Sequence, residues 1–209
     1  MNAQQKFAAA LDHVPLVAVL RGLQPHEAQD MGEALTSTGW TAIEVPLNSP
    51  DPFKSIATLA RNFPAALTGA GTVLTPDEVR KVHAAGGQLI VSPNFSAAVV
   101  REAVRLGMVC LPGVATPTEA FAALEAGADG LKLFPAEMIP PAVVRALRAV
   151  LPANARVLPV GGITPENMGG YLAAGASGFG IGSALYKPGM TAAQVRARAP
   201  SFISACRLP

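Results

Sequence analysis

The chain has 209 residues, of which 50% are hydrophobic and 14% charged, and its formal net charge at pH 7 is +2. This composition indicates a folded protein with a substantial core and excludes a largely disordered chain. The weak net charge, without a basic stripe interleaved with aromatic residues, argues against a nucleic-acid-binding protein.

The sequence lacks the patterns that mark membrane insertion, secretion or metal binding. Its apolar runs are shorter than the roughly 18 residues that a membrane-spanning helix needs, and Met1–Asp12 does not read as a signal peptide. We therefore expect a cytoplasmic protein. Cys110 and Cys206 do not make a disulfide framework, and the three histidines show no metal-ligand spacing, so no metal is expected.

Short apolar runs alternate with helical stretches along the chain, after an expected helix over Asn2–His13. Near-continuous apolar runs are typical of strands buried on both faces of a parallel sheet. The runs recur roughly every 20 to 27 residues, which suits repeated βα units. The predicted strands are Leu16–Leu20, Ala42–Val45, Ala66–Thr68, Leu89–Ser92, Met108–Leu111, Gly130–Phe134, Val157–Val160 and Phe179–Ile181.

Repeated start and stop signals define the helices between these strands. Thr-Pro pairs at Thr75, Thr116 and Thr164 provide an N-cap followed by a proline at the first helical position. Glycines such as Gly86 and Gly127 can end a helix in the left-handed conformation. Eight units of this kind favour an α/β fold, a closed (β/α)₈ or TIM barrel with an extra N-terminal helix, as a single domain over residues 1–209.

Lys132 is the most informative candidate for a catalytic residue, because active sites in this fold lie at the carboxyl ends of the strands. It is a lone charge in an apolar strand, and burial of an unpaired ammonium is unfavourable. At an unperturbed pKa only about 1 lysine in 2,500 is free amine at pH 7, and a dry interior raises that fraction. The pattern indicates a nucleophile, unless Lys132 lies at a strand edge and reaches solvent.

Glu44 and Arg21 are the two other charged residues at strand ends. Glu44, within Ala42-Ile43-Glu44-Val45, could pair with Lys132 or Arg21, or could transfer protons. The alternative is a buried ion pair. Arg21 ends the first strand and suits a carboxylate or phosphate, and its alternative is a salt bridge at the rim.

Glycine pairs after the last two strands predict a phosphate site. Gly161-Gly162 precedes the helix start at Thr164, and Gly182-Ser183 follows the last strand. Loops at these places frequently bind phosphate through backbone amides, although glycine also serves tight turns. Thr72 could bind a carboxylate or be an ordinary turn residue, and Phe134 could wall the pocket or pack in the core.

Taken together and in this order, these segments resemble the lysine-dependent aldolases that act on 2-dehydro-3-deoxy-6-phospho sugar acids. The resemblance runs from about residue 15 to 187. It is carried by Val19-Leu20-Arg21-Gly22, Glu44 to Pro50, Gly69 to Leu74, Ser92-Pro93-Asn94, Pro112 to Glu119, Leu131 to Pro135, Val160 to Ile163 and Gly182-Ser183.

The resemblance implies a role for each residue. Lys132 would form the Schiff base and Glu44 would be the general acid and base. Substrate would be bound by Arg21, Thr72, Pro93, Phe134, Gly161, Gly162, Gly182 and Ser183. The family implies a cytoplasmic homotrimer that needs no cofactor or metal, with a phosphorylated keto acid and pyruvate as its ligands.

The stretch after Glu44 distinguishes branches of the family. Pro46-Leu47-Asn48-Ser49 resembles the branch that acts on the phosphogalactonate epimer, whereas the gluconate branch has Thr-Leu-Arg-Thr there. Residues 136–141 differ from common members, which leaves the substrate contacts of that loop open.

The resemblance implies cleavage of 2-dehydro-3-deoxy-6-phosphogalactonate to pyruvate and glyceraldehyde 3-phosphate through a Schiff base. Three alternatives stay open. The first is the same reaction on the gluconate epimer, and the second is an isomerase or epimerase that uses Glu44 as the base. The third is a barrel that binds phosphorylated metabolites without turnover, since one fold hosts many chemistries.

Overall fold

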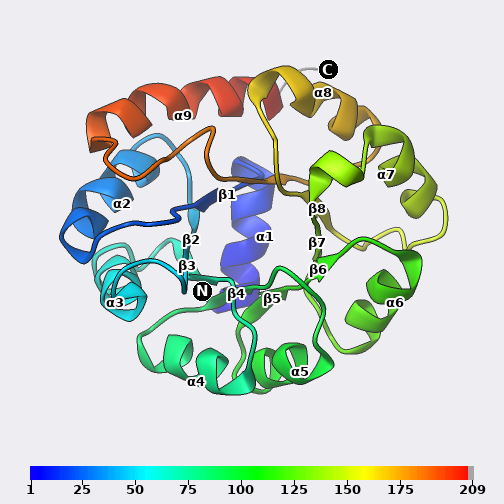
Figure 1. Cartoon of the computed structure of the whole chain (residues 1–209), viewed down its shortest axis with the longest axis horizontal. Coiled ribbons are helices and arrows are strands. Elements are labelled where there is room, and N and C mark those ends of the chain that lie inside the picture. Colours follow the sequence, from blue (N-terminus) through cyan, green and yellow to red (C-terminus); the bar gives the residue numbers. More distant parts are fainter. Residues whose placement is uncertain (207–209) are drawn as a thin grey trace.

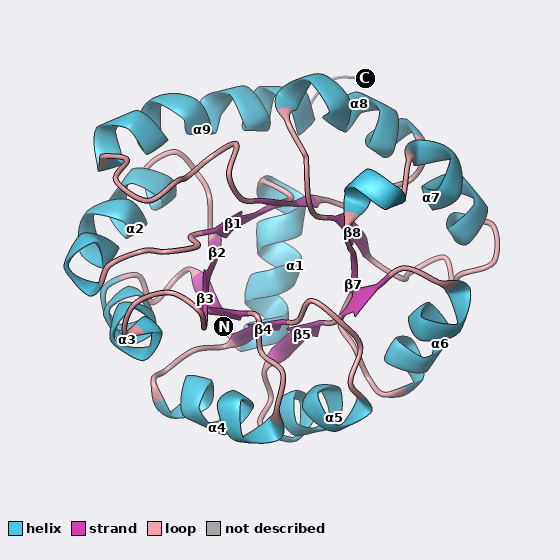
Figure 2. Ribbon diagram, viewed as in Figure 1, coloured by secondary structure: helices cyan, strands magenta, loops and turns pink. Residues whose placement is uncertain are grey.

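The computed structural model describes residues 1–206, in which parallel strands surround a common centre and helices cover them on the outside (Figures 1 and 2). A six-stranded sheet has the order β5-β4-β3-β2-β1-β9 and a three-stranded sheet the order β6-β7-β8. The strands are β1 Leu16–Val19, β2 Ala42–Pro46, β3 Leu67–Gly71, β4 Leu89–Val91, β5 Val109–Leu111, β6 Gly113–Val114, β7 Leu131–Leu133, β8 Val157–Pro159 and β9 Phe179–Ile181.

The prediction of a closed eight-stranded barrel is wrong, because the hydrogen-bond ladders form two separate sheets. The segment after α5 changes partner at Pro112: β5 pairs with β4, and β6 pairs with β7. Pro112 has no N–H to donate, so a proline breaks a ladder at this point. On the other side, an isolated bridge between Val160 and Gly180 links the ends of β8 and β9 within the described chain.

The helices begin and end close to the predicted signals. They are α1 Ala3–His13, α2 Ala28–Thr36, α3 Pro52–Asn62, α4 Pro76–Ala84, α5 Ala97–Arg105, α6 Pro117–Glu125, α7 Pro141–Arg148, α8 Pro165–Ala173 and α9 Ala192–Cys206, with short 3₁₀ helices η1 Pro25–Glu27 and η2 Ala136–Met138. Thr75 and Thr116 cap α4 and α6, as predicted, and they form capping boxes with Glu78 and Glu119. None of the helices within residues 1–206 is long and apolar enough to cross a membrane.

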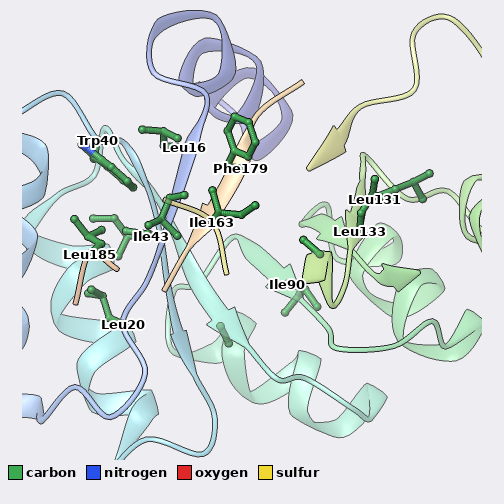
Figure 3. Packing of buried hydrophobic residues seen from close by; sticks show 14 of the residues in the cluster. Leu16, Leu20, Trp40, Ile43, Ile90, Leu131, Leu133, Ile163, Phe179 and Leu185 are labelled. Carbon is green, nitrogen blue, oxygen red and sulfur yellow. The ribbon is translucent and has the colours of Figure 1, made fainter. Parts of the chain in front are cut away.

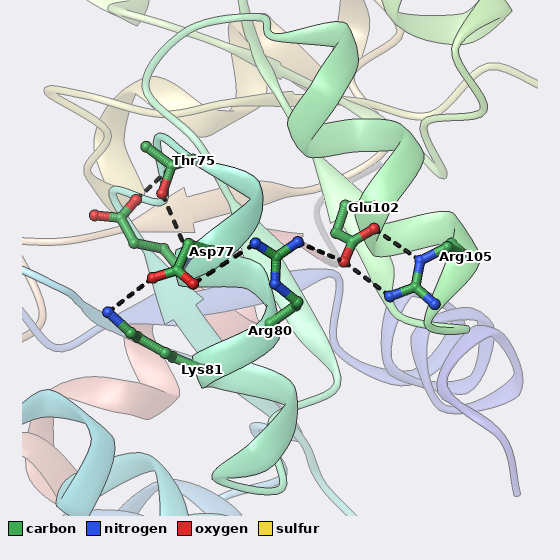
Figure 4. A network of polar contacts seen from close by, with 7 residues as sticks. Thr75, Asp77, Arg80, Lys81, Glu102 and Arg105 are labelled. Atoms are coloured by element: carbon green, nitrogen blue, oxygen red, sulfur yellow. Dashed lines mark hydrogen bonds and ion pairs between the residues drawn. The ribbon is translucent and has the colours of Figure 1, made fainter.

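Charged side chains join neighbouring helices on the outer surface. Glu102 of α5 accepts hydrogen bonds from Arg80 of α4, at 3.1 Å, and from Arg105, at 2.8 Å (Figure 4). Asp77 pairs with Lys81 one turn further along α4, at 2.8 Å. Of these contacts, the Arg80–Glu102 pair links α4 to α5, and surface pairs of this kind stabilise a fold only slightly.

The core has two parts. The larger lies between the strands and the outer helices and includes Trp40, Ile43, Leu131 and Phe179 (Figure 3). The smaller lies inside the ring of strands, where Phe7 of α1 packs with inward-facing strand residues. Helix α1 is seen through the middle of the ring (Figure 2) and so covers one end of the interior. The opposite end of the interior, at the carboxyl ends of the strands, is where the candidate site lies.

Candidate active site

A cavity of about 300 Å³ lies at the carboxyl ends of the strands and brings most of the predicted site residues together. Eight of the ten residues predicted to act or bind line it: Arg21, Glu44, Lys132, Phe134, Gly161, Gly162, Gly182 and Ser183. The other lining residues are Val19, Val160, Ile163, Thr164, Ala184 and Lys187. The cavity therefore combines charged groups at its base with a glycine-rich rim.

Lys132 points into the interior because it sits in the middle of β7. Leu131 and Leu133 face the outer helices and are fully buried, so strand alternation directs Lys132 inward. Its side chain is 7% exposed, and Nζ lies 4.4 Å from the centroid of the Phe134 ring. The alternative of a lysine reaching solvent from a strand edge does not fit this position.

The surroundings of Lys132 favour a free amine. Burial lowers the pKa of Lys132 because a charged ammonium loses its hydration there. The negative charge of Glu44 opposes this, and the positive charge of Arg21 lowers the Lys132 pKa further. A lysine with a lowered pKa in a cavity can act as a nucleophile near neutral pH.

Glu44 projects from β2 into the same space and is 2% exposed. Burial raises the pKa of Glu44 to about 7, against the opposing charges of Lys132 and Arg21 and the amide of Gly71. Its Oε2 atom has no hydrogen-bond partner, and no ion pair joins Glu44 to a cation within residues 1–206. The buried ion pair considered above is therefore not formed. A carboxyl with a pKa near 7 can both take and return a proton.

Gly71 of β3 makes room for this carboxylate. A Cβ atom added at Gly71 would lie 2.0 Å from Oε2 of Glu44. Any side chain at this position would therefore displace the Glu44 carboxylate. Below Glu44 and Lys132 the interior is apolar. A free space of about 10 Å³ lies there, and its lining includes Val17, Val91 and Leu158. Gly71 therefore leaves room for the Glu44 carboxylate, and the apolar floor contributes to the burial of both Glu44 and Lys132.

Arg21 stands at the rim and is exposed. Its Nη1 donates a hydrogen bond to Oδ1 of Asn48, at 2.7 Å, and the N–H of Gly22 donates to Oγ of Ser49, at 2.9 Å. These bonds join the ends of β1 and β2. Arg21 forms no ion pair among the described residues, so the rim salt bridge is absent and its guanidinium can meet an anion.

The glycine turns form the other side of the cavity. Gly161 and Gly162 have φ angles of 109° and 61°, which L-residues with a side chain rarely adopt. The turn is held by Asn167, whose Nδ2 donates to the carbonyl of Gly162 at 2.8 Å. After β9, the carbonyl of Gly182 accepts the N–H groups of Leu185 and Tyr186. Both turns are therefore tightly folded and expose backbone to the cavity.

Three residues lie in places that the sequence did not predict. Thr72 and Pro93 do not line the cavity; Thr72 is a turn residue with φ of 58°, and the carbonyl of Pro93 lies close to Gly113. Sequence reasoning missed Lys187, which lines the cavity from the loop after β9. Its signal was present, because Lys187 is the only charged residue between Glu166 and Arg196.

Known proteins share this architecture. The family model for KDPG and KHG aldolase matches residues 7–198. A protein of Rhizobium meliloti (strain 1021) named probable 2-dehydro-3-deoxy-6-phosphogalactonate aldolase is 54% identical over 91% of each chain. A solved structure described as native KDPGal is 46% identical over 93% of this chain and 95% of its own, with a TM-score of 0.91.

A more distant structure adds a chemical observation about that protein. KDPG aldolase from Legionella pneumophila, with pyruvate captured at low pH as a covalent carbinolamine intermediate, has a TM-score of 0.78 and 27% identity over 99% of this chain and 97% of its own. The family match covers most of the chain, and the cavity holds the lysine, glutamate and glycine turns from which the resemblance was first drawn. The chain belongs to the KDPG and KHG aldolase family.

Proposed function

We propose that this protein cleaves 2-dehydro-3-deoxy-6-phosphogalactonate to pyruvate and glyceraldehyde 3-phosphate through a Schiff base on Lys132. The observation that carries the proposal is the buried Lys132 amine, with its lowered pKa, in one cavity with a carboxyl whose pKa is about 7. The names of the relatives at 54% and 46% identity support the substrate.

In the proposed reaction, the Lys132 amine attacks the C2 ketone, and water is lost to give an iminium. Glu44, directly or through a water molecule, takes the proton of the C4 hydroxyl. The C3–C4 bond breaks, its electron pair moves into the iminium to give an enamine, and the aldehyde leaves. Glu44 then returns a proton to C3, and hydrolysis releases pyruvate and the free amine.

The ends of the substrate would be held by opposite sides of the cavity. Arg21 at the rim suits the carboxylate, and Phe134 forms a wall beside Lys132. The phosphate would bind at the turns of Gly161, Gly162, Gly182 and Ser183, which line the cavity and would offer it backbone amides. Binding energy from this remote group then positions C4 for cleavage. Thr72 and Pro93 lie outside the cavity lining, and their contact with substrate, which the resemblance implies, is proposed with the others.

Borohydride reduction in the presence of pyruvate tests the proposal. We expect a covalent adduct on the peptide that contains Lys132, and its loss in Lys132→Ala together with nearly all turnover. Lys81→Met, on the outer surface of α4, is the control and should form the adduct normally. An unmodified Lys132 peptide under conditions that trap a known Schiff-base enzyme would contradict the mechanism and favour an isomerase.

The preference between epimers is a separate part of the proposal. Asn48, which holds Arg21, belongs to the Pro46-Leu47-Asn48-Ser49 stretch that resembles the galactonate branch. We expect a higher kcat/KM for the phosphogalactonate epimer than for the phosphogluconate epimer. A strong preference for the gluconate epimer would overturn the interpretation of this stretch while leaving the Schiff base in place.

The remaining features implied by the resemblance are proposals of the same kind. We infer that the protein is a homotrimer in the cytoplasm and folds as one domain, whose last three residues, 207–209, lie outside the described part of the chain. Sedimentation equilibrium at several concentrations tests the trimer, and a mass of one chain would exclude it.

A further inference from the structure

We propose that Lys187 makes the site selective for phosphorylated substrates by placing a positive charge beside the two glycine turns. The inference rests on the proposed aldolase function and adds a residue to it. Lys187 lines the main cavity together with Gly161, Thr164 and Ser183, and it also lines an adjoining cavity of about 370 Å³. Gly182 and Ser183 also line both cavities, so Lys187 lies where the two cavities meet, together with the turn after β9.

The charges of the cavity leave Lys187 as the cation for the phosphate end. A phosphate monoester carries about −1.5 to −2 charges at neutral pH. The cations that line the cavity are Arg21, Lys132 and Lys187. Lys132 must be neutral to attack the ketone, and Arg21 is held toward β2 by Asn48. Within residues 1–206, Lys187 forms no ion pair with a carboxylate, so its charge is available for a ligand.

The glycine turns need such a cation because their own donors are partly occupied. The N–H of Thr164, at the start of α8, already donates to Oδ1 of Asn167 at 3.0 Å. In addition, the carboxylate of Glu137 packs against the turn: a Cβ atom added at Gly161 would lie 2.4 Å from its Oε2. Glu137 brings negative charge close to the place where a phosphate would bind, and Lys187 offsets the resulting repulsion.

The loop that carries Lys187 is firmly anchored, so its long side chain starts from a fixed point. Leu185 and Tyr186 are buried, and their N–H groups donate to the carbonyl of Gly182. The Tyr186 hydroxyl donates to Oε2 of Glu27 at 3.4 Å. On the other side, Pro188 packs on Gly22, where an added Cβ atom would lie 2.7 Å from the proline ring. A fixed backbone reduces the entropy lost when Lys187 binds an anion.

The test compares two aldehydes in the condensation direction with pyruvate. Lys187→Met removes the charge and keeps the length of the side chain, and Lys187→Arg keeps the charge. We expect Lys187→Met to lower kcat/KM for glyceraldehyde 3-phosphate by about 10- to 100-fold, the range for loss of one charged hydrogen bond. The kcat/KM for unphosphorylated glyceraldehyde should change by less than about twofold, and Lys187→Arg should retain most of the selectivity.

Calorimetry measures the direct binding of inorganic phosphate and gives a readout that does not depend on turnover. Weaker binding to Lys187→Met than to the wild type and to Lys81→Met supports the inference. Equal losses with both aldehydes, or unchanged phosphate binding, would overturn it. Failure of the wild type to trap pyruvate would refute the aldolase proposal, and the phosphate measurement would still decide the role of Lys187.

Discussion

Glu44 and Arg21 act on the pKa of Lys132 in opposite directions, although burial is the largest cause of its shift. The Glu44 anion stabilises the ammonium, so Glu44→Gln should lower the Lys132 pKa further and move pyruvate trapping to lower pH. The Arg21 cation destabilises the ammonium, so Arg21→Leu should move trapping to higher pH. The measurement is the initial rate of adduct formation across a pH series, with pyruvate well below saturation, because this rate follows the fraction of Lys132 present as free amine.

The opposite signs make this comparison informative. Both variants remove a charge from the same cavity, and a general loss of packing would move the two midpoints in one direction. Movement of both midpoints the same way would therefore contradict the electrostatic account. Glu44→Gln should also lose most of its turnover, because the amide cannot take the proton of the C4 hydroxyl.

At the scale of single elements, α8 offers a simple test of stability. Gly169 lies inside this helix, and beyond its chain neighbours and the nearby backbone of the helix no heavy atom of residues 1–206 lies within 4 Å of the position that a Cβ would occupy. Alanine restricts the unfolded chain and favours helix, so Gly169→Ala should stabilise the protein by roughly 0.5 to 1 kcal/mol. Thermal or denaturant unfolding measures this change.

Gly175, just beyond the same helix, provides the matched control. Its φ of 93° is unfavourable for alanine, and an added Cβ would lie 3.1 Å from Arg148. Gly175→Ala should therefore destabilise the fold by about 1 to 2 kcal/mol. A loss of stability in Gly169→Ala would contradict the prediction and would show that the surface of α8 around Gly169 makes contacts beyond those described above.

At the scale of the whole molecule, helix α1 packs at one end of the interior and the candidate active site lies at the other. Phe7 of α1 is 1% exposed, packs inside the ring of strands, and has the Arg156 guanidinium 5.0 Å from its ring centroid. Phe7→Ala should destabilise the protein by about 3 to 5 kcal/mol through the cavity it leaves. Below the unfolding transition kcat/KM should stay near the wild-type value, and a selective loss of kcat/KM in folded protein would contradict this separation.

Local signals made much of this molecule predictable. Lys132 and Glu44 were found because each is an isolated charge in an apolar strand, and burial of such a charge needs a reason. Thr75 and Thr116 were found because a helix start has few chemical solutions. The aldolase function was implied by the resemblance that these segments carry, and the family match agrees with it.

The features that were not predicted depend on how distant segments meet. The division into two sheets follows from the change of partner at Pro112 and from the sparse pairing between β8 and β9, and apolar patterning carries no information on either. Lys187 was missed because it lies on a loop, where a lysine is usually solvated. Thr72 follows a strand as expected, has a left-handed φ of 58° and does not line the cavity, and the sequence pattern does not indicate this φ.

The apolar floor beneath Lys132 has a consequence for the proposed cycle. Its free space of about 10 Å³ has few polar partners to offer, and a site of this size and character does not store water. In the proposed cycle, the water molecule that frees pyruvate would then come from the main cavity, which is also the exit for the aldehyde.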